Sequence, residues 1–101
     1  MDALTDPEID TALATLGPAW RREGDSIVAE LEREDFAAAI ALVNAIAAEA
    51  ERADHHPDIL IHGYRRLTIT LTTHAAGGLT QRDFALARAI DSLAGTEQAA
   101  G

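Results

Sequence analysis

The chain contains no cysteine, and its eight basic residues are all arginine, so lysine is absent as well. Without cysteine the protein cannot form disulfide bonds, thiolate zinc sites or a cysteine nucleophile. This absence says little about the cellular compartment, because many proteins of every compartment lack cysteine. It does mean that any chemistry of this chain proceeds without a thiol.

Long apolar segments are also absent. No stretch approaches the roughly 20 apolar residues that a membrane-spanning helix requires. The first residues, Met1 to Asp6, lack the basic region and the apolar run of a secretory signal. We therefore expect a soluble, cytoplasmic protein that makes no membrane contact.

Positive charge is scarce. The 8 arginines stand against 17 acidic residues, which gives a formal net charge of -9 at pH 7. A field of this sign repels phosphate backbones, so a nucleic-acid partner is not expected.

The length and composition are those of one small folded protein. Of the 101 residues, 48% are hydrophobic and 25% are charged, which is ordinary for a folded chain and unlike a disordered one. No internal repeat or linker divides the sequence. We expect a single domain over residues 1–101 with a frayed tail over residues 95–101, where the side chains are small and polar.

Three segments have the apolar spacing of helices. The first begins at Asp6-Pro7-Glu8, which offers an N-cap and a proline at the first helical position, and continues to Gly17-Pro18. The second begins at Asp35 and is stopped before Pro57, and the third begins with a capping-box-like pair, Thr80 and Asp83. The apolar residues that mark the second helix are Phe36, Ile40, Val43 and Ala47, reinforced by Ala39, Leu42 and Ile46.

The remaining segments favour strands. Residues 20–32 alternate around Gly24-Asp25 and predict a hairpin with one buried face. Residues 58–64 and 65–74 predict two further strands joined tightly near Gly63, with His74 at the end of the polar series of the second strand. The order α-β-β-α-β-β-α predicts an α+β fold in which helices cover one face of a four-stranded antiparallel sheet.

Three of the four histidines are candidates for catalysis, namely His55, His56 and His74. Imidazole can change its charge near neutral pH, and carboxylates nearby suit it to proton transfer. Glu51 lies four residues before His55, so on a continuing helix its carboxylate would face and orient that imidazole. The fourth histidine, His62, has no predicted role.

Structural roles could also explain these residues. The pair of Glu51 and His55 could stabilise a helix end, and Asp83 could serve as a cap. His74 could be a solvent-exposed residue at a strand end. A zinc site of three imidazoles is disfavoured, because adjacent histidines on an extended backbone point to opposite sides, so we expect no metal.

Taken together, these residues resemble the signature of the pterin-4a-carbinolamine dehydratase family. That signature is an acidic or polar residue, three others, two histidines (or His-Asn) and a proline, followed by a spaced aromatic residue, a histidine and an aspartate. The gaps of six, nine and eight residues match as well. The resemblance covers residues 16–94, and it departs from the family where aromatic residues are common, at Ala29, Leu31 and Ile59. The matching residues are Glu51, His55-His56-Pro57, Tyr64, His74 and Asp83, with upstream landmarks at Trp20, Gly24, Ile27, Asp35 and Phe36.

The resemblance implies a hydro-lyase, a 4a-hydroxytetrahydrobiopterin dehydratase, that converts 4a-hydroxytetrahydropterin to quinonoid dihydropterin and water. It implies no metal or organic cofactor, since the pterin is the substrate. It further implies a place in the recycling of the tetrahydrobiopterin cofactor of aromatic amino acid hydroxylases. Such a hydroxylase is an expected partner, and assembly into a homodimer or homotetramer is expected.

The resemblance also implies roles for individual residues. His55 and His74 would form the acid and base pair, in an order that the sequence leaves open. His56 would bind and polarise the pterin, with Trp20 and Asp54 as further substrate contacts. Glu51 and Asp83 would orient the imidazoles.

Two other functions are compatible with the same resemblance. A similar fold serves as a dimerisation cofactor of a homeodomain transcription factor, so a non-catalytic protein-binding role is one alternative. A related activity on another pterin, such as a molybdenum-cofactor precursor, is the other. The intact set of three histidines favours catalysis, because a binding module has no evident need for it.

Overall fold

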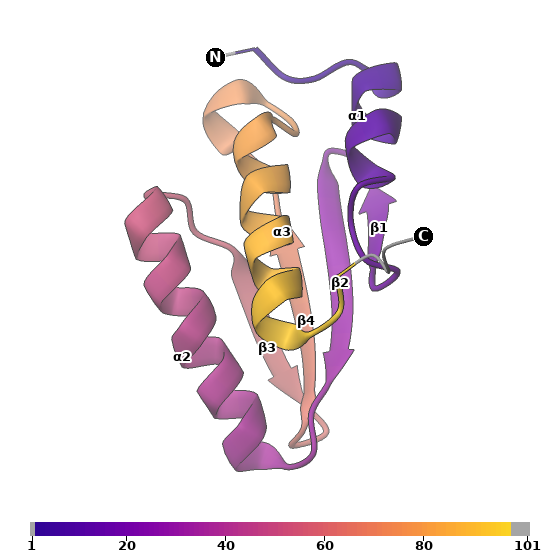
Figure 1. Cartoon of the computed structure of the whole chain (residues 1–101). Helices are drawn as coiled ribbons and strands as arrows, with labels where there is room; N and C mark the ends of the chain where they lie inside the picture. Colours follow the sequence, from indigo (N-terminus) through magenta and orange to yellow (C-terminus); the bar gives the residue numbers. More distant parts are fainter. Residues whose placement is uncertain (1, 98–101) are drawn as a thin grey trace.

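A computed structural model describes residues 2–97 of the chain and has the predicted order of elements (Figure 1). One short 3-10 helix, η1, is inserted between the last strand and the last helix. The elements are α1 Asp6–Leu13, β1 Trp20–Glu23, β2 Ser26–Glu32, α2 Phe36–Ala53, β3 Asp58–His62, β4 Arg66–Leu71, η1 His74–Ala76 and α3 Gln81–Ala94.

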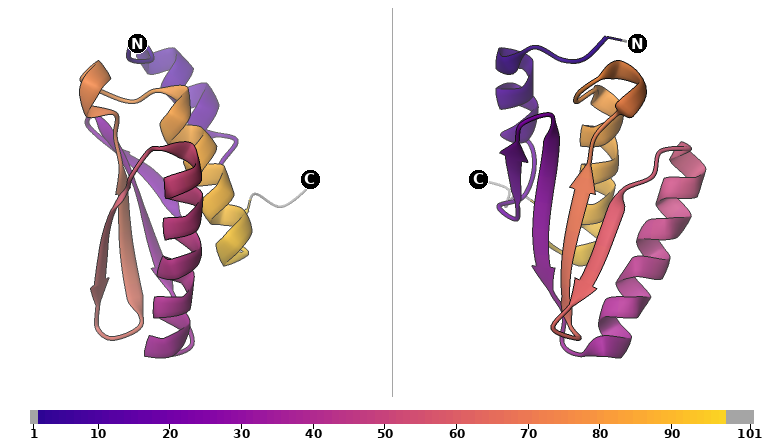
Figure 2. Two further views of the ribbon diagram at one scale, coloured as in Figure 1. Left: turned by 90° about the vertical axis from the view of Figure 1, so that its left-hand side faces the viewer. Right: turned by 180° about the vertical axis from the view of Figure 1, so that it is seen from behind.

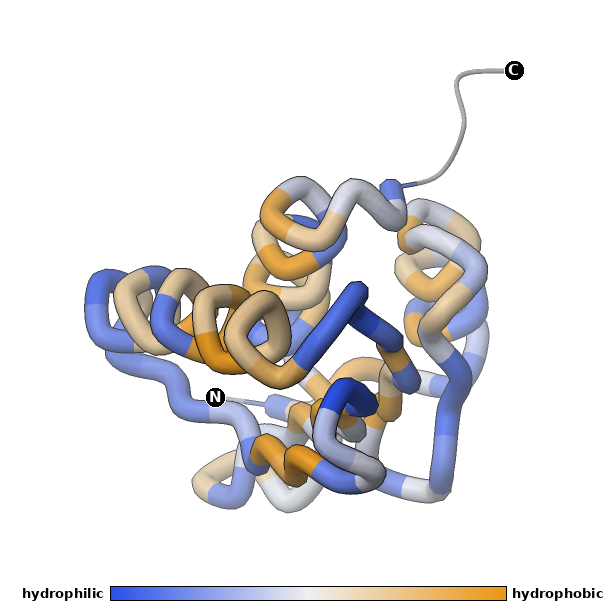
Figure 3. The backbone as a smooth tube through the Cα atoms, turned by 90° about the horizontal axis from the view of Figure 1, so that it is seen from below, coloured by the Kyte–Doolittle hydropathy of each residue, from blue (hydrophilic) through white to orange (hydrophobic). Residues whose placement is uncertain are grey.

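The four strands form one antiparallel sheet in the order β1-β2-β4-β3. The three helices lie on one face of this sheet (Figure 2), and a view from below shows helices and strands as two layers (Figure 3). The predicted α+β class is therefore confirmed. None of the helices within residues 2–97 is both long and apolar enough to cross a membrane.

The core lies between the two layers. Alternate residues of β4 point into it, and Leu67, Ile69 and Leu71 are completely buried there. Phe84 and Ile90 of α3 pack against them from the helical layer and are also fully buried. The alternation of apolar and polar residues along β4 thus determines which face of this strand packs against the helices.

The buried face of α2 includes Ala39, Leu42 and Ile46, the residues that reinforce the apolar spacing in the sequence. Its fully or nearly fully buried residues are Ala39, Leu42, Ile46 and Ala50, whereas Phe36 is 54% exposed. Phe36 and Ala47, which follow the predicted helical period, therefore lie outside the buried face. Both stripes have the same helical period, and an alanine-rich helix is apolar almost all round, so periodicity alone does not select the face.

The first helix is shorter than predicted and is capped by a different residue. Thr5, not Asp6, is the N-cap, and it forms a reciprocal capping box with Glu8. The backbone N–H of Thr5 donates to the Glu8 carboxylate and holds the pKa of Glu8 below its usual value. The helix ends at Leu13, and Leu16 reaches the core from the turns that follow.

The strands β3 and β4 also end earlier than expected. Their connection comprises residues 63–65, because His62 pairs with Arg66. Gly63 and Tyr64 both adopt positive φ angles in this turn, a conformation that glycine tolerates and other residues adopt at a cost. The tight connection predicted near Gly63 is therefore present.

A buried carboxylate joins the connection between α1 and β1 to the segment that follows α3. Asp91 of α3 accepts hydrogen bonds from the backbone N–H of Gly17 at 2.8 Å, from the indole N–H of Trp20 at 3.0 Å and from the Thr96 hydroxyl at 2.8 Å. The N–H of Thr96 also donates to the Asp91 carbonyl. Within the tail that was expected to fray, Thr96 is thus hydrogen-bonded to Asp91, and residues 98–101 of that tail lie outside the described residues.

This carboxylate yields a prediction about stability. In Asp91→Ala the buried N–H groups of Gly17 and Trp20 lose their acceptor, and each such loss costs about 1 to 3 kcal/mol. We expect the free energy of unfolding to fall by about 3 kcal/mol in urea titrations. The control is Ser92→Ala, whose exposed hydroxyl contacts Glu97. Equal stability of the two variants would contradict the role given to Asp91.

Candidate active site

The end of α2 determines where the histidine pair points. The helix stops at Ala53, and Asp54 follows with a φ of 49° and a ψ of 47°, a left-handed conformation that is uncommon for residues other than glycine. The N–H of His55 then donates to the carbonyl of Ala50 at 3.1 Å. Beyond Pro57 the chain continues as β3. This turn directs His55 inward and His56 outward, as expected for neighbours on a non-helical backbone.

His55 is buried and bonded to a buried carboxylate. Its Nε2 lies 2.6 Å from Oδ1 of Asp83, which has no solvent exposure. The other oxygen of Asp83 accepts from the Thr80 N–H at 2.9 Å and from the Thr73 hydroxyl at 2.8 Å. Because Asp83 serves as the acceptor for all three groups, the hydrogen-bond network assigns the proton to Nε2 of His55. Nδ1 of the neutral ring is then the nitrogen with a free lone pair.

His56 is exposed and has a different carboxylate partner. Its Nε2 lies 2.6 Å from Oε2 of Glu51, whose side chain is 76% exposed. The expectation that Glu51 faces His55 was wrong, because the helix does not continue to residue 55. The left-handed turn at Asp54 brings the next histidine back over the last turn of α2 instead.

His74 does not lie on a strand, contrary to expectation. The strand β4 ends at Leu71, and His74 is the first residue of η1, where it is exposed. Gly77 adopts a φ of 72°, and Gly78 forms a bridge with Thr73. Because of this reversal, the extended backbone ends early and His74 lies at the same cavity as His55 and His56. The alternating pattern of β4 contains no signal for it.

The three histidines line one cavity of about 280 Å³ between the end of α2 and η1. Both segments lie in the upper part of the molecule in Figure 1. The convergence expected of His55, His56 and His74 is therefore present in the structure. The predicted substrate contact Asp54 also borders the cavity. Arg82 is there too, although no pattern in the sequence indicates a role for it. The full lining is Asp54, His55, His56, Thr72, Thr73, His74, Ala75 and Arg82.

The structure does not bring Trp20 or Tyr64 to this cavity. Trp20 lies on β1, at the opposite edge of the sheet from β3, and its buried indole is bonded to Asp91. Tyr64 is 62% exposed in the turn between β3 and β4, at the other end of the sheet (Figure 1). His62 lies near that turn and contacts the Thr68 hydroxyl. The predicted contact of Trp20 with substrate has no support in this geometry.

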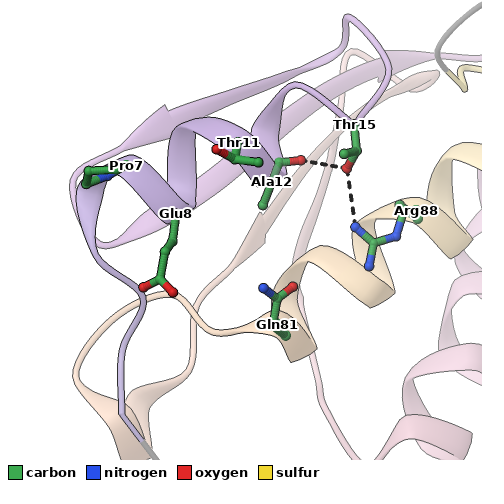
Figure 4. A pocket seen from close by; sticks show the side chains of 7 residues that line it. All are labelled: Pro7, Glu8, Thr11, Ala12, Thr15, Gln81 and Arg88. Atoms are coloured by element: carbon green, nitrogen blue, oxygen red, sulfur yellow. Dashed lines mark hydrogen bonds between the residues drawn. The ribbon is translucent and has the colours of Figure 1, made fainter.

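A larger cavity of about 430 Å³ lies between α1 and α3 (Figure 4). Its charged side chains are Glu8 and Arg88, and the guanidinium of Arg88 donates to the Thr15 hydroxyl at 3.3 Å. It contains no imidazole. Of these two cavities, only the smaller one is lined by histidines, so it is the candidate site for acid–base chemistry near neutral pH.

Within residues 2–97, no three side chains of His, Cys, Asp or Glu come close enough together to hold a metal ion. No buried side-chain nitrogen or oxygen in this part of the chain lacks a hydrogen-bond partner. The polar groups around His55 are thus mutually satisfied, and the site is held by its own hydrogen bonds.

Comparison with known proteins identifies the family. Residues 2–93 match the family model described as pterin 4 alpha carbinolamine dehydratase, and the chain belongs to this family. A relative from Nocardia farcinica, provisionally named pterin-4-alpha-carbinolamine dehydratase, is 56% identical over 93 residues, which are 92% of this chain and 96% of the relative. A relative from Chloroflexus aurantiacus with the same provisional name is 50% identical over 95 residues, covering 94% of this chain and all of the relative.

Solved structures show the same fold. A transcriptional coactivator/pterin dehydratase from Brucella melitensis has a TM-score of 0.87 and 32% identity, covering 92% of this chain and 99% of that one. A pterin dehydratase-like protein described as a RuBisCO assembly factor in the alpha-carboxysome has a TM-score of 0.66 and 28% identity, covering 78% and 93%. These two proteins are therefore described with functions other than dehydration, one as a coactivator and the other as an assembly factor.

The two carboxylate–histidine pairs should differ sharply in their effect on stability. Asp83→Ala leaves His55, Thr73 and the Thr80 N–H without their shared buried acceptor, so we expect a loss of about 3 to 5 kcal/mol in the free energy of unfolding. Glu51→Ala removes an exposed pair and should cost less than about 1 kcal/mol. Urea titrations of both variants test this, and a larger loss in Glu51→Ala would refute the contrast.

Proposed function

We propose that this protein dehydrates a 4a-hydroxytetrahydropterin to quinonoid dihydropterin. The observation that carries the proposal is the convergence of three imidazoles on one cavity, two of them with carboxylate partners at 2.6 Å. Membership of the pterin 4-alpha-carbinolamine dehydratase family supports the choice of substrate. The cavity is smaller than those of typical drug-sized sites, which fits a compact bicyclic ring left partly open to solvent.

The reaction needs two proton transfers and no electrons from outside. The bond between carbon 4a and the hydroxyl oxygen breaks, and that oxygen leaves as water after it receives a proton. The N5–H bond also breaks. Its proton departs, and the electron pair of that bond forms the double bond between N5 and carbon 4a. Substrate therefore equals product plus water, and imidazoles can perform both transfers.

We assign the base to His55. Its Nε2 donates to Asp83, which leaves Nδ1 to accept the proton from N5. The imidazolium that forms is then stabilised by the buried carboxylate, as in other carboxylate–histidine pairs. Because Asp83 is itself fixed by Thr73 and Thr80, the ring cannot rotate away from its acceptor.

We assign the acid to His74 and substrate binding to His56. His74 is exposed at the rim, so it can take its proton back from solvent after each turnover. His56 is held by Glu51 and can donate a hydrogen bond to an acceptor of the pterin. Asp54 borders the same cavity and is the remaining candidate for a substrate contact.

The chemistry of substrate and product places the enzyme between two other reactions. A hydroxylase that transfers oxygen by way of a tetrahydropterin leaves a hydroxyl at carbon 4a, and a reductase must return the quinonoid product to the tetrahydro form. We therefore propose a role in recycling the cofactor of aromatic amino acid hydroxylases. Assembly into a homo-oligomer and a cytoplasmic location remain part of this proposal.

A protein-binding role is the second candidate, because two solved relatives are described as a coactivator and as an assembly factor. A non-catalytic role would leave the buried pair of His55 and Asp83 without a function beyond the stability of the fold. A related activity on another pterin would use the same cavity and differ only in the ligand.

The activity assay separates these candidates. The pure protein should accelerate formation of quinonoid dihydropterin from chemically generated 4a-hydroxytetrahydropterin, followed by absorbance. His55→Ala and His74→Ala should each lower the rate by about 10² to 10⁴, as for the loss of a general acid or base. His62→Ala removes an imidazole outside the cavity and should keep the full rate. No acceleration by the wild-type protein would favour the protein-binding role.

The dependence of the rate on pH tests the assignment of acid and base. A general base must be deprotonated and a general acid protonated, so the base produces the fall in rate at low pH and the acid the fall at high pH. We expect the residual activity of His55→Ala to lose the low-pH fall and that of His74→Ala to lose the high-pH fall. The opposite pattern would exchange the two roles.

A further inference from the structure

Arg82 connects the start of α3 with the end of α2. Its Nη2 donates to the carbonyl of Asp54 at 2.7 Å and to the carbonyl of Ala53 at 3.1 Å. The same side chain lines the histidine cavity. Arg82 forms no salt bridge with a carboxylate among residues 2–97, so these two carbonyls are its charge-assisted contacts.

These carbonyls need a partner from outside their own helix. The last carbonyls of an α-helix have no intrahelical donor. The left-handed conformation of Asp54 is strained, so contacts with surrounding residues are needed to maintain it. The Asp54 carbonyl belongs to the same peptide group as the N–H of His55, which donates to Ala50 at 3.1 Å. That peptide group is therefore fixed on both sides, by Arg82 and by Ala50.

Two consecutive residues of α3 thus hold one histidine at two points. Arg82 holds the backbone that leads into His55, and Asp83 holds the imidazole of His55. We infer that Arg82 is a positioning residue that fixes the His55–His56 pair relative to His74. This inference rests on the proposed function for its effect on catalysis, whereas its effect on the backbone is independent of any activity.

The test compares two arginines of the same helix. Arg82→Ala removes the contacts with Ala53 and Asp54, and Arg88→Ala is the matched control, because Arg88 is also exposed on α3 but contacts Thr15 across the other cavity. We expect Arg82→Ala to lower kcat about 10- to 100-fold, since misplacing a catalytic group by about 1 Å has that effect, and Arg88→Ala to keep the wild-type kcat. Arg82→Lys keeps a donor but loses the planar fork, so its kcat should be intermediate.

A second readout does not require activity. Hydrogen exchange of the His55 backbone N–H, measured by NMR, should become faster in Arg82→Ala, because its bond to Ala50 is no longer supported. The N–H of Ile69 in the buried centre of β4 should keep its protection, and Arg88→Ala should match the wild type at both positions.

The outcomes separate the inference from the proposed function. Unchanged kcat and unchanged His55 exchange in Arg82→Ala would overturn the inference, and so would faster exchange at both His55 and Ile69, which would indicate general destabilisation. An inactive wild-type protein would overturn the proposed function, and the exchange measurement would still decide whether Arg82 fixes the backbone at His55.

Discussion

The geometry of the site depends on the carboxylate of Asp83. This fully buried group satisfies the first turn of α3, accepts from the hydroxyl of Thr73 and orients the ring of His55. One side chain thereby joins the end of α2, the segment before η1 and the start of α3. A buried carboxylate with its full set of donors is rigid, because moving any one donor breaks a buried hydrogen bond.

The site combines this rigid part with a more open one. His56 and Glu51 are exposed, and His74 lies in a short turn that reverses at Gly77, whose φ is positive. A buried pair suits a group that must keep one orientation and one tautomer, whereas an exposed imidazole can exchange protons with water. The cavity therefore contains imidazoles in two different environments, which is how one residue type can act both as a base and as an acid.

Patterns that act locally were predictable from the sequence, and contacts between distant segments were not. The hairpin turn at Gly24-Asp25, the capping box of Thr80 and Asp83 and the order of the elements follow from local rules, and all are present. The spacing of the histidines indicated the site through its resemblance to a family. The partner of Glu51 was predicted wrongly, because a left-handed residue at Asp54 has no reliable signature in a single sequence.

Other details depend on tertiary packing. Trp20 and Arg82 are examples, since an isolated tryptophan fits either a core or a pocket wall, and an arginine in the first turn of a helix is usually a solvated side chain. The strand order β1-β2-β4-β3 places Trp20 at the sheet edge opposite β3, and the turn at the end of α2 places two carbonyls within reach of Arg82. Neither juxtaposition can be derived from spacing along the chain.

The proposed function requires one pterin ring to contact all three imidazoles of the cavity. The most direct measurement is the NMR spectrum of the four histidine rings while a stable dihydropterin is added. A pterin bound in this cavity should shift the ring signals of His55, His56 and His74 together with one binding constant, and those of His62 should stay in place. Shifts confined to His62, or saturable binding that leaves all four rings unchanged, would contradict the proposed function.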